Sequence, residues 1–355
     1  MSRMQTIPVH TEPAYEVTIG SGLLQDCGPR LRPLLGPCRL AIIVDSTVAP
    51  LYLERVSDSL KAAGFQVSTC LFPAGEAHKT IKTLTWILEF LADSQLTRSD
   101  CVIALGGGVC GDMAGFAAAV YLRGIRYVQL PTTLLAAVDS SVGGKTAIDL
   151  EVGKNLVGAF LQPSAVLFDT DCLKTLLPAI WADGAAEAIK TGVLVGPSLF
   201  DALDNGLLTE DPAAAIARCV TYKAGVVERD EKEQGERRLL NLGHTVAHGI
   251  EKCSKYTIPH GHAVAAGLAV IAKASEKLGW TEEPVAESIC RCLEAHRLPT
   301  TTDFAPADLA EAALSDKKRS GDSLTLVIPQ KIGHCVQKAV PVEQLEDIFF
   351  AGLEG

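Results

Sequence analysis

Residues 100–112 read Asp-Cys-Val-Ile-Ala-Leu-Gly-Gly-Gly-Val-Cys-Gly-Asp, an apolar run that passes directly into closely spaced glycines. A short apolar run bounded by a turn is typical of a strand buried inside a sheet. The glycines match the pattern G-x-G-x-x-G and stand before a helical run, so we expect a sharp turn from strand to helix. This stretch therefore predicts an α/β fold.

Similar apolar runs lie on both sides of this stretch, at residues 39–45, 66–72, 126–130 and 165–168. Helical patterns lie between them: one runs to about residue 63 and another covers residues 80–93. Strands that alternate with helices form a mainly parallel sheet with helices on both faces. We therefore expect residues 1–177 to form a Rossmann-like α/β domain.

The sequence pattern changes after about residue 177. Long stretches rich in Ala, Leu and Glu follow, at residues 213–230, 240–252, 263–278 and 283–296. They contain few β-branched alternations, which favours helices over strands. One short apolar strand is expected late, at residues 324–328. Residues 178–355 are therefore predicted to form an all-α C-terminal domain.

The 355 residues carry a net charge of −10, and 48% of them are hydrophobic, which is a globular composition. This charge argues against binding to nucleic acid or to an anionic membrane. The eleven cysteines show no disulfide-framework or zinc-knuckle spacing, so free thiols in a reducing compartment are expected. The sequence shows no signal peptide and no apolar stretch long enough to span a bilayer. We therefore expect a cytoplasmic protein.

The glycine pattern has two interpretations. A dinucleotide site would use the glycines for close backbone approach and the helix N-terminus for a pyrophosphate. However, the pattern follows the third strand rather than the first, and no acidic residue lies about twenty residues beyond it, so a tight turn without ligand is an equal alternative. Asp45, at the end of the first strand, either hydrogen-bonds a ribose or caps the next helix together with Ser46.

A second unusual stretch covers residues 131–146, Pro-Thr-Thr-Leu-Leu-Ala-Ala-Val-Asp-Ser-Ser-Val-Gly-Gly-Lys-Thr. Small hydroxyl residues, paired glycines and Lys145 suit a backbone that wraps an anion. It is not a Walker A loop, because Asp139 stands where that motif needs its first glycine. Lys154 and Asn155 follow closely. A single lysine is by default a solvated surface residue, but two lysines within ten residues of this stretch favour an anion site.

The helical half contains residues of the kind that bind metal ions. Glu187, His244 and His260 offer one carboxylate and two imidazoles, a set that can hold Zn²⁺ and leave one position open for a substrate. Lys190 lies three residues after Glu187 and His248 four after His244, so each pair shares a helix face. A lone helical histidine is more often a core or surface residue, so the prediction depends on the combination.

Three polar residues lie in the sequence before His244. They are Lys223, Arg237 and Asn241. Their spacing is compatible with recognition of a carboxylate, although surface ion pairs would produce the same spacing.

Together these motifs resemble the 3-dehydroquinate synthase family. The matching segments are 106–116, 131–146, 153–160, 187–190, 241–248 and 260–264, in the family's order, and the similarity extends over residues 14–350. The resemblance implies a dehydroquinate synthase-like fold and a small-molecule substrate, the sugar-acid phosphate 3-deoxy-arabino-heptulosonate 7-phosphate. The products would be 3-dehydroquinate and phosphate, in the second step of the shikimate pathway. The implied cofactors are NAD and a divalent metal, usually Zn²⁺, although Co²⁺ suits the same ligands.

The resemblance also implies a reaction sequence. NAD oxidises the substrate transiently, phosphate leaves by β-elimination, and the hydride returns. The ring then opens and an intramolecular aldol addition closes the carbocycle. Because NAD is regenerated in each cycle, the enzyme would be a lyase.

By position, the resemblance implies that the metal ligands are Glu187, His244 and His260. The implied NAD-binding residues are Asp45, Gly75, Glu76, Ala77, His78, Lys79, Gly108, Val109, Cys110, Gly111, Asp112, Thr132, Thr133, Lys145, Lys154, Cys172, Leu173, Lys174 and Thr175. The implied catalytic and substrate-binding residues are Asp139, Lys145, Asn155, Lys190, Lys223, Arg237, Asn241, His248 and Arg123. Arg123 looks like the arginine that reaches a neighbouring subunit's phosphate pocket in this family, which implies a homodimer. The late Asp316-Lys317-Lys318 resembles a family motif whose lysine points into the site.

The chain departs from the family pattern at a few positions. His262 stands where the family usually has Glu, and it is a competing ligand to His260. Asp149 replaces a usual Asn, Ala137 a usual Gln, and Val246 and Ala247 the usual Phe and Gly.

Three alternatives to this family's activity remain. They are another NAD- and metal-dependent sugar-phosphate cyclase, such as one acting on sedoheptulose 7-phosphate, a polyol dehydrogenase of the same general fold, and a non-catalytic binding protein. The retained cations Lys223 and Arg237 favour a substrate with a carboxylate, and therefore dehydroquinate synthase.

Overall fold

The computed structural model describes residues 4–314, 319–320 and 322–354. The predicted motif at Asp316-Lys317-Lys318 lies outside these residues. The chain divides into two compact units, and the first comprises Met1–Leu176 together with Lys223–Glu231. The second comprises Leu177–Tyr222 and Lys232–Gly355. None of the described helices is long and apolar enough to cross a membrane.

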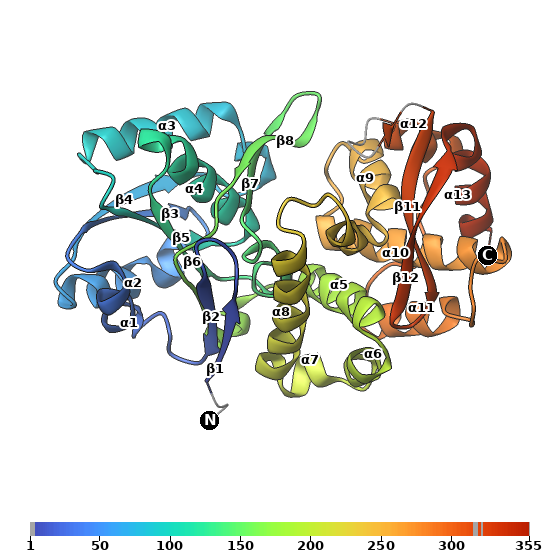
Figure 1. The fold of residues 1–355 in the computed structure, drawn as a ribbon, viewed down its shortest axis with the longest axis horizontal. Helices are drawn as coiled ribbons and strands as arrows, with labels where there is room; N and C mark the ends of the chain where they lie inside the picture. The colour runs from blue at the N-terminus through green and yellow to red at the C-terminus, as the bar shows by residue number, and fades with distance from the viewer. Residues whose placement is uncertain (1–3, 315–318, 321, 355) are drawn as a thin grey trace. The chain divides into compact units, whose positions relative to one another are not determined.

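The first unit is built on a seven-stranded sheet in the order β1-β2-β9-β6-β5-β3-β4 (Figure 1). The strands are β1 (Gln5–Val9), β2 (Tyr15–Gly20), β3 (Arg39–Asp45), β4 (Gln66–Phe72), β5 (Cys101–Gly106), β6 (Arg126–Pro131) and β9 (Val166–Asp169). All neighbours pair in parallel except β1 and β2. The five predicted strands are therefore confirmed, and β5, which precedes the glycines, lies inside the sheet.

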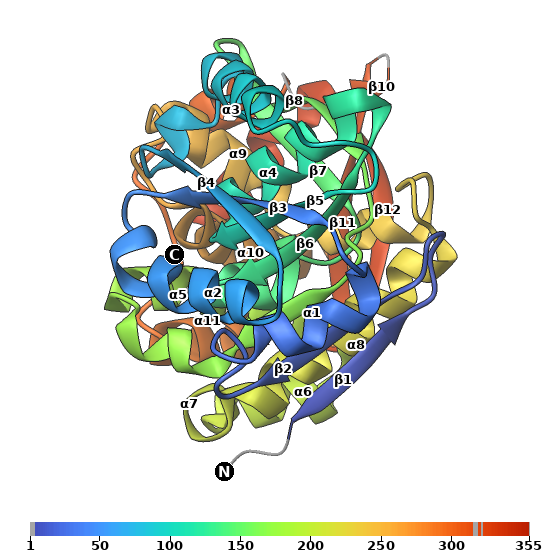
Figure 2. The same cartoon turned by 90° about the vertical axis from the view of Figure 1, so that its left-hand side faces the viewer.

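Helices cover both faces of this sheet, as expected. Figure 2 shows α3 (Ile81–Asp93) and α4 (Gly108–Val120) on one side, and α1 (Cys27–Leu35) and α2 (Ala49–Ala62) on the other. The side chains of β3 alternate between the two faces. Leu40, Ile42 and Val44 belong to the core under α1 and α2, whereas Ala41 and Ile43 belong to the core under α3 and α4. A strand buried on both faces is apolar throughout, which is why β3 was recognised as a continuous run.

Two hairpins were not predicted. β1 and β2 form an antiparallel pair at the sheet edge, and β7 (Lys145–Leu150) pairs with β8 (Gly153–Phe160) in a separate two-stranded sheet. Gly158 permits the second pairing, because a Cβ there would lie 2.1 Å from the carbonyl oxygen of Thr146. Much of β8 is exposed, including most of its apolar residues 156–160, so it is not a buried strand of the kind that the sequence analysis recognised. Residues 131–146, where the sequence favours an anion site, contain a π-helical turn (Ala136–Ser140) and end at the start of β7.

The second unit is predominantly helical, as predicted. Its helices are α5 (Pro178–Val195), α6 (Pro197–Asp204), α7 (Leu207–Glu210), the first part of α8 (Pro212–Arg229), α9 (His244–Cys253), α10 (His260–Lys277), α11 (Ala286–Ala295), α12 (Pro306–Ala313) and α13 (Leu345–Leu353). It is not strictly all-α, because β10 (Arg319–Ser320), β11 (Ser323–Lys331) and β12 (His334–Pro341) form a three-stranded antiparallel sheet. The sequence predicted only the apolar middle of β11.

The buried helix α10 is in contact with α5, α9 and α13. Its approach to α9 is very close, since a Cβ on Gly267 would lie 2.3 Å from the carbonyl oxygen of Gly243. This carbonyl precedes His244, the first residue of α9. The small residues of α10 therefore set the distance at which the beginning of α9 is held.

Candidate active site

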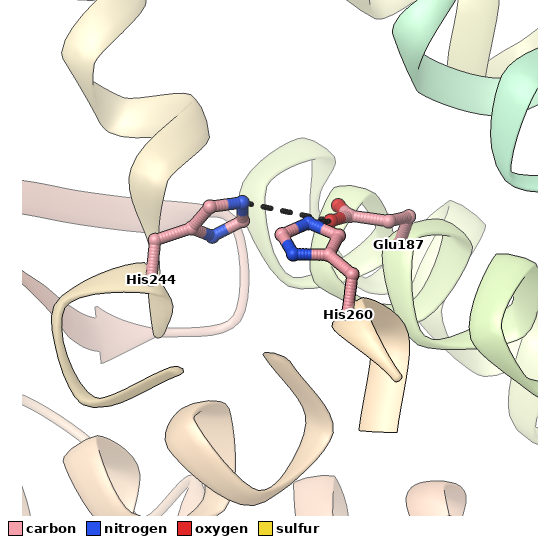
Figure 3. A group of neighbouring side chains, drawn as sticks. All are labelled: Glu187, His244 and His260. Atoms are coloured by element: carbon pink, nitrogen blue, oxygen red, sulfur yellow. Dashed lines mark ion pairs between the residues drawn. The ribbon is translucent and has the colours of Figure 1, made fainter. Parts of the chain in front are cut away.

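Three helices of the second unit each contribute one residue to a group of metal-type ligands (Figure 3). Glu187 comes from α5, and His244 and His260 are the first residues of α9 and α10. One ligand atom from each lies within 4.8 Å of the others. The Oε1 atom of Glu187 is 3.5 Å from Nε2 of His244 and 3.3 Å from Nε2 of His260. The structure thus brings together three residues that lie far apart in the sequence.

The carboxylate of Glu187 is fully buried. Its Oε2 atom is 2.5 Å from the ammonium of Lys190, which is also buried and lies one turn later on α5. This contact is an ion pair, and within the described residues neither oxygen of Glu187 receives a hydrogen bond of good geometry. Because a buried carboxylate without full hydrogen bonding is costly, the position favours a cation.

Both histidines direct Nε2 toward Glu187 and have an acceptor at Nδ1. Nδ1 of His244 is 3.1 Å from the carbonyl oxygen of Leu242, and Nδ1 of His260 is 3.3 Å from Oε1 of Glu251. A proton on Nδ1 satisfies each contact and leaves Nε2 as the electron-pair donor. Two imidazole nitrogens and one carboxylate oxygen fit Zn²⁺ or Co²⁺ with a position open for substrate.

The electrostatics of the group also favour a cation. Burial lowers the pKa of His260, but the neighbouring carboxylates of Glu187 and Glu251 outweigh burial and raise this pKa to about 10. The same negative charge that holds a proton on the ring attracts a divalent ion. The residues present therefore fit the metal that the sequence implies.

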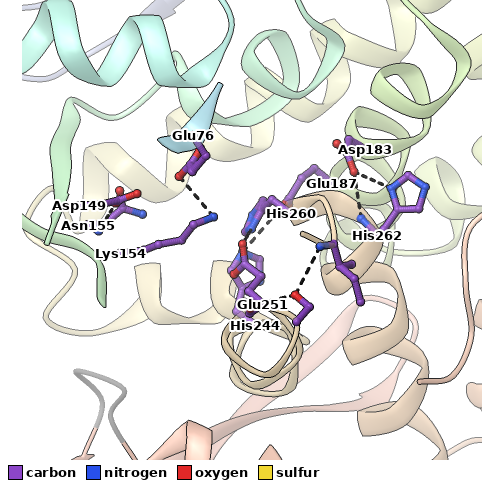
Figure 4. A network of polar contacts seen from close by, with 12 residues as sticks. Glu76, Asp149, Lys154, Asn155, Asp183, Glu187, His244, Glu251, His260 and His262 are labelled. Carbon is purple, nitrogen blue, oxygen red and sulfur yellow. Dashed lines mark hydrogen bonds and ion pairs between the residues drawn. The ribbon is translucent and has the colours of Figure 1, made fainter. Parts of the chain in front are cut away.

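His262 does not join this group. Its Nδ1 atom is 2.7 Å from Oδ1 of Asp183, and its backbone N–H donates to the same oxygen at 3.0 Å (Figure 4). Residues two apart on a helix point about 200° away from each other, so His260 and His262 face different neighbours. The idea that His262 competes for the metal finds no support in this geometry.

In the first unit, the glycine turn is shaped by close packing. A Cβ on Gly106 would lie 2.5 Å from Cβ of Cys110, and one on Gly111 would lie 2.7 Å from Oε1 of Gln129. Helix α4 therefore packs tightly on β6. Two glycines, Gly107 and Gly108, stand at the beginning of α4. A Cβ on Gly107 would lie 3.0 Å from Cγ2 of Thr133, and one on Gly108 would lie 3.1 Å from Oγ of Ser140. The turn thus has a packing role, and it also places hydroxyl groups beside a helix N-terminus.

Asp45 lies beside this turn. Its Oδ1 atom accepts hydrogen bonds from the backbone N–H groups of Thr47 and Val48, at 2.8 and 3.0 Å, just before α2. Its Oδ2 atom would be 3.3 Å from a Cβ on Gly106, so that oxygen faces the glycine turn. Ser46 does not share the capping role, because its hydroxyl accepts from the backbone N–H of Ala74.

Several implied cofactor residues gather around Lys79, which is buried. Its ammonium is 2.6 Å from Oδ2 of Asp112, 2.5 Å from Oδ1 of Asn155 and 3.9 Å from Oε1 of Glu76. Glu76 also pairs with Lys154 at 3.3 Å (Figure 4). Burial lowers the pKa of Lys79, but the carboxylates outweigh it and raise this pKa to about 12. The ammonium therefore remains charged and holds this group together.

The remaining implied cofactor residues lie in short elements of the same unit. Gly75 precedes the 3₁₀ turn Glu76–His78, which contains Ala77. Thr132 is buried, and its backbone N–H donates to the carbonyl of Gly106. Cys172, Leu173 and Lys174 form part of the 3₁₀ segment Thr170–Thr175, whose Thr175 hydroxyl contacts the phenol of Tyr52.

The implied substrate residues are distributed over both units. In the first, the ammonium of Lys223 binds the carbonyl oxygen of Asp139 at 2.6 Å and forms an ion pair with its carboxylate. Lys145, which begins β7, is exposed.

In the second unit, Arg237 and Asn241 belong to the 3₁₀ segment Glu236–Asn241, and Arg237 is buried. Asn241 donates to Oε1 of Glu233 at 2.9 Å. The ring of His248 lies 5.8 Å from that of His244, so this residue borders the metal-type ligands.

Arg123 lies in an exposed, strained turn of the first unit. Leu122 and Arg123 have φ values of 51° and 68°, and Gly124 follows with 115°. Positive φ is uncommon for residues other than glycine, and it costs free energy. Arg123 therefore lies in an exposed turn whose backbone conformation is uncommon for residues other than glycine.

Two carboxylates beside the metal-type ligands were missed in the sequence. Glu251 contacts His260, and Asp183 contacts His262. Both lie at helical spacing from a predicted ligand, Glu251 seven residues after His244 and Asp183 four before Glu187. This spacing was the available signal, since such residues share a helix face.

Similarity to known proteins identifies the family. Residues 69–182 match the family described as 3-dehydroquinate synthase N-terminal, and residues 184–319 match 3-dehydroquinate synthase C-terminal. The 3-dehydroquinate synthase of Neisseria meningitidis serogroup B is 46% identical over 339 residues, which cover 93% of this chain and 94% of that protein. This chain belongs to the 3-dehydroquinate synthase family. The enzyme of Enterococcus faecalis strain OG1RF is 41% identical over 346 residues, 96% of each chain.

Solved structures with a similar fold support the fold class. The structure of 2-deoxy-scyllo-inosose synthase complexed with carbaglucose-6-phosphate, NAD⁺ and Co²⁺ has a TM-score of 0.86 at 25% identity, and covers 98% of this chain and 100% of that one. The 2-epi-5-epi-valiolone synthase from Streptomyces hygroscopicus subsp. jinggangensis 5008, with NAD⁺ and Zn²⁺ bound, has a TM-score of 0.87 at 26% identity, with coverages of 95% and 96%. Glycerol dehydrogenase from Schizosaccharomyces pombe shares the fold alone, at 17% identity and a TM-score of 0.61. The resemblance and the fold class predicted from the sequence are confirmed.

Proposed function

We propose that this chain is a 3-dehydroquinate synthase, a lyase that converts 3-deoxy-arabino-heptulosonate 7-phosphate into 3-dehydroquinate and phosphate. The observation that carries the proposal is the convergence of Glu187, His244 and His260 in a chain 41–46% identical to curated enzymes of this name. The buried cations Lys223 and Arg237 support a substrate that carries a carboxylate.

We propose NAD and a divalent metal, Zn²⁺ or Co²⁺, as cofactors. When bound, the metal would polarise adjacent substrate hydroxyls, and NAD would take up a hydride and return it in the same cycle. Glu187, His244 and His260 would hold the metal in the second unit. In the first unit, the glycine turn, Asp45 and the residues around Lys79 would hold NAD.

The chain's own residues would bind and orient the substrate. Lys145, Asn155, Lys190 and Arg123 of the partner subunit would hold the phosphate, and Lys223 and Arg237 the carboxylate. Asp139 contacts the Lys223 ammonium through both its carbonyl and its carboxylate, so it keeps that cation in place. Lys190 also neutralises one oxygen of Glu187, which limits the negative charge near the phosphate.

We further propose a cytoplasmic homodimer. The exposed turn at Arg123 supports it, because an arginine at the surface can reach a neighbouring subunit's anion. The first unit would be the NAD-binding domain, and the second the metal- and substrate-binding domain.

One experiment separates the proposal from its rivals. The purified chain is incubated with 3-deoxy-arabino-heptulosonate 7-phosphate, NAD⁺ and Zn²⁺, while phosphate and the absorbance of NADH are followed. We expect stoichiometric phosphate release without accumulation of NADH. Lasting NADH absorbance would instead indicate a polyol dehydrogenase, and turnover of sedoheptulose 7-phosphate alone would indicate another cyclase.

A further inference from the structure

The first turn of α10 is held from two sides within the second unit. Helix α9 supplies the ligand His244 and the carboxylate Glu251, which contacts His260 at 3.3 Å. Helix α5 supplies the ligand Glu187 and the carboxylate of Asp183, which contacts His262 at 2.7 Å. Each neighbouring helix thus provides one ligand and one carboxylate that fixes α10.

Glu251 is the carboxylate that touches a ligand directly. It is 2% exposed, and it lies about two helical turns after His244 on the same side of α9. The two imidazole ligands therefore differ in their Nδ1 partners. His244 meets the neutral carbonyl of Leu242, whereas His260 meets a buried carboxylate.

A carboxylate at Nδ1 has two effects on an imidazole ligand. It fixes the tautomer that leaves Nε2 as the donor, and it increases the electron density that Nε2 offers to a metal. It also fixes the plane of the ring. His260 needs such a partner more than His244 does, because its side chain is one-third exposed, at 33% against 10%.

We propose that Glu251 is a positioning residue for the metal and acts through His260. It holds the proton at Nδ1 and directs Nε2 toward Glu187, where the ion binds. This inference rests on the metal dependence in the proposed function, and it adds a residue outside the three ligands.

The test measures metal affinity rather than turnover. Dissociation constants for Zn²⁺ and Co²⁺ are determined by competition with a chromophoric chelator, for the parent chain, Glu251→Gln and Glu251→Asp. The glutamine variant keeps the size and removes the charge, so we expect an affinity about 10- to 100-fold weaker. The visible absorption spectrum of bound Co²⁺ should also change. The aspartate variant keeps the charge, but its shorter side chain places the carboxylate farther from Nδ1 of His260. Its metal affinity should therefore lie between those of the parent chain and Glu251→Gln.

Glu276→Gln is the matched control. Glu276 lies on α10 and accepts hydrogen bonds from the backbone N–H groups of Val285 and Ala286, away from the ligands. Its substitution should leave the metal affinity unchanged. Equal affinities for the parent, Glu251→Gln and Glu251→Asp would overturn the proposal, as would an equal loss in Glu276→Gln. A parent chain that binds metal but does not turn over substrate would count against the proposed function alone.

Discussion

At the residue scale, the orientation of a few side chains decides the chemistry. His260 and His262 stand two residues apart and have the same side chain, yet only His260 faces Glu187. The sequence predicted His260 as the ligand and left His262 as a competitor, because spacing alone does not show where a helix begins or what lies beside it. The first turn of α10, placed between α5 and α9, decides between them.

This assignment predicts different effects for the two histidines. His260→Ala should weaken Zn²⁺ binding by more than about 100-fold, because it removes one of three ligands. His262→Ala should change the affinity by less than about tenfold, since Asp183 and not the metal is its partner. Chelator competition measures both, and an equal loss in the two variants would contradict the assignment.

At the element scale, helix packing sets the distance between ligands. Gly267 on α10 has no room for a side chain, since a Cβ there would lie 2.3 Å from a carbonyl and 2.9 Å from the backbone nitrogen of Ala247. These are backbone atoms of α9 and of the residue before it, and they cannot move independently of His244. The glycine therefore contributes to the metal site without touching it.

Gly267→Ala should consequently have two effects. The clash should lower the free energy of unfolding by about 1–3 kcal/mol, and displacement of His244 should weaken Zn²⁺ binding. Denaturant unfolding and chelator competition measure these separately. Gly225→Ala is the control, because a Cβ there meets only the flexible end of Arg229. Destabilisation in the control as large as in Gly267→Ala would remove the packing explanation.

At the scale of the whole molecule, function would depend on a second copy of the chain. Arg123 is exposed on a strained turn, and we propose that it serves the partner's phosphate site. The net charge of −10 makes such local cations necessary for an anionic substrate.

A mixed dimer tests this dependence. Arg123→Ala and His244→Ala should each lack activity alone. The first removes a cation that binds the substrate's phosphate, and the second removes a metal ligand. Co-expression should restore part of the activity, since a mixed dimer has one site with both residues intact. Phosphate release from the purified mixture measures it. Absence of rescue in a mixture that sedimentation shows to be dimeric would argue that Arg123 acts within its own subunit.

The sequence by itself determined the alternation of strands and helices, the helical second half and the family. Continuous apolar runs and motif order are local properties of the chain, and β3 and β5 are buried on both faces and therefore easy to recognise. It did not predict β1, β2, β7, β8 or most of the small sheet at β10–β12, because polar residues shorten or interrupt the apolar run in each of these strands.

Only the tertiary structure decided how the site is held. It turned His262 toward Asp183, placed Glu251 behind His260, and paired Lys190 with Glu187 and Lys223 with Asp139. Two of these contacts, Asp183 with His262 and Asp139 with Lys223, join segments that are separated in sequence by other elements. The physical reason is that the direction of a side chain depends on where its helix begins and on which helices pack beside it, and neither property is local.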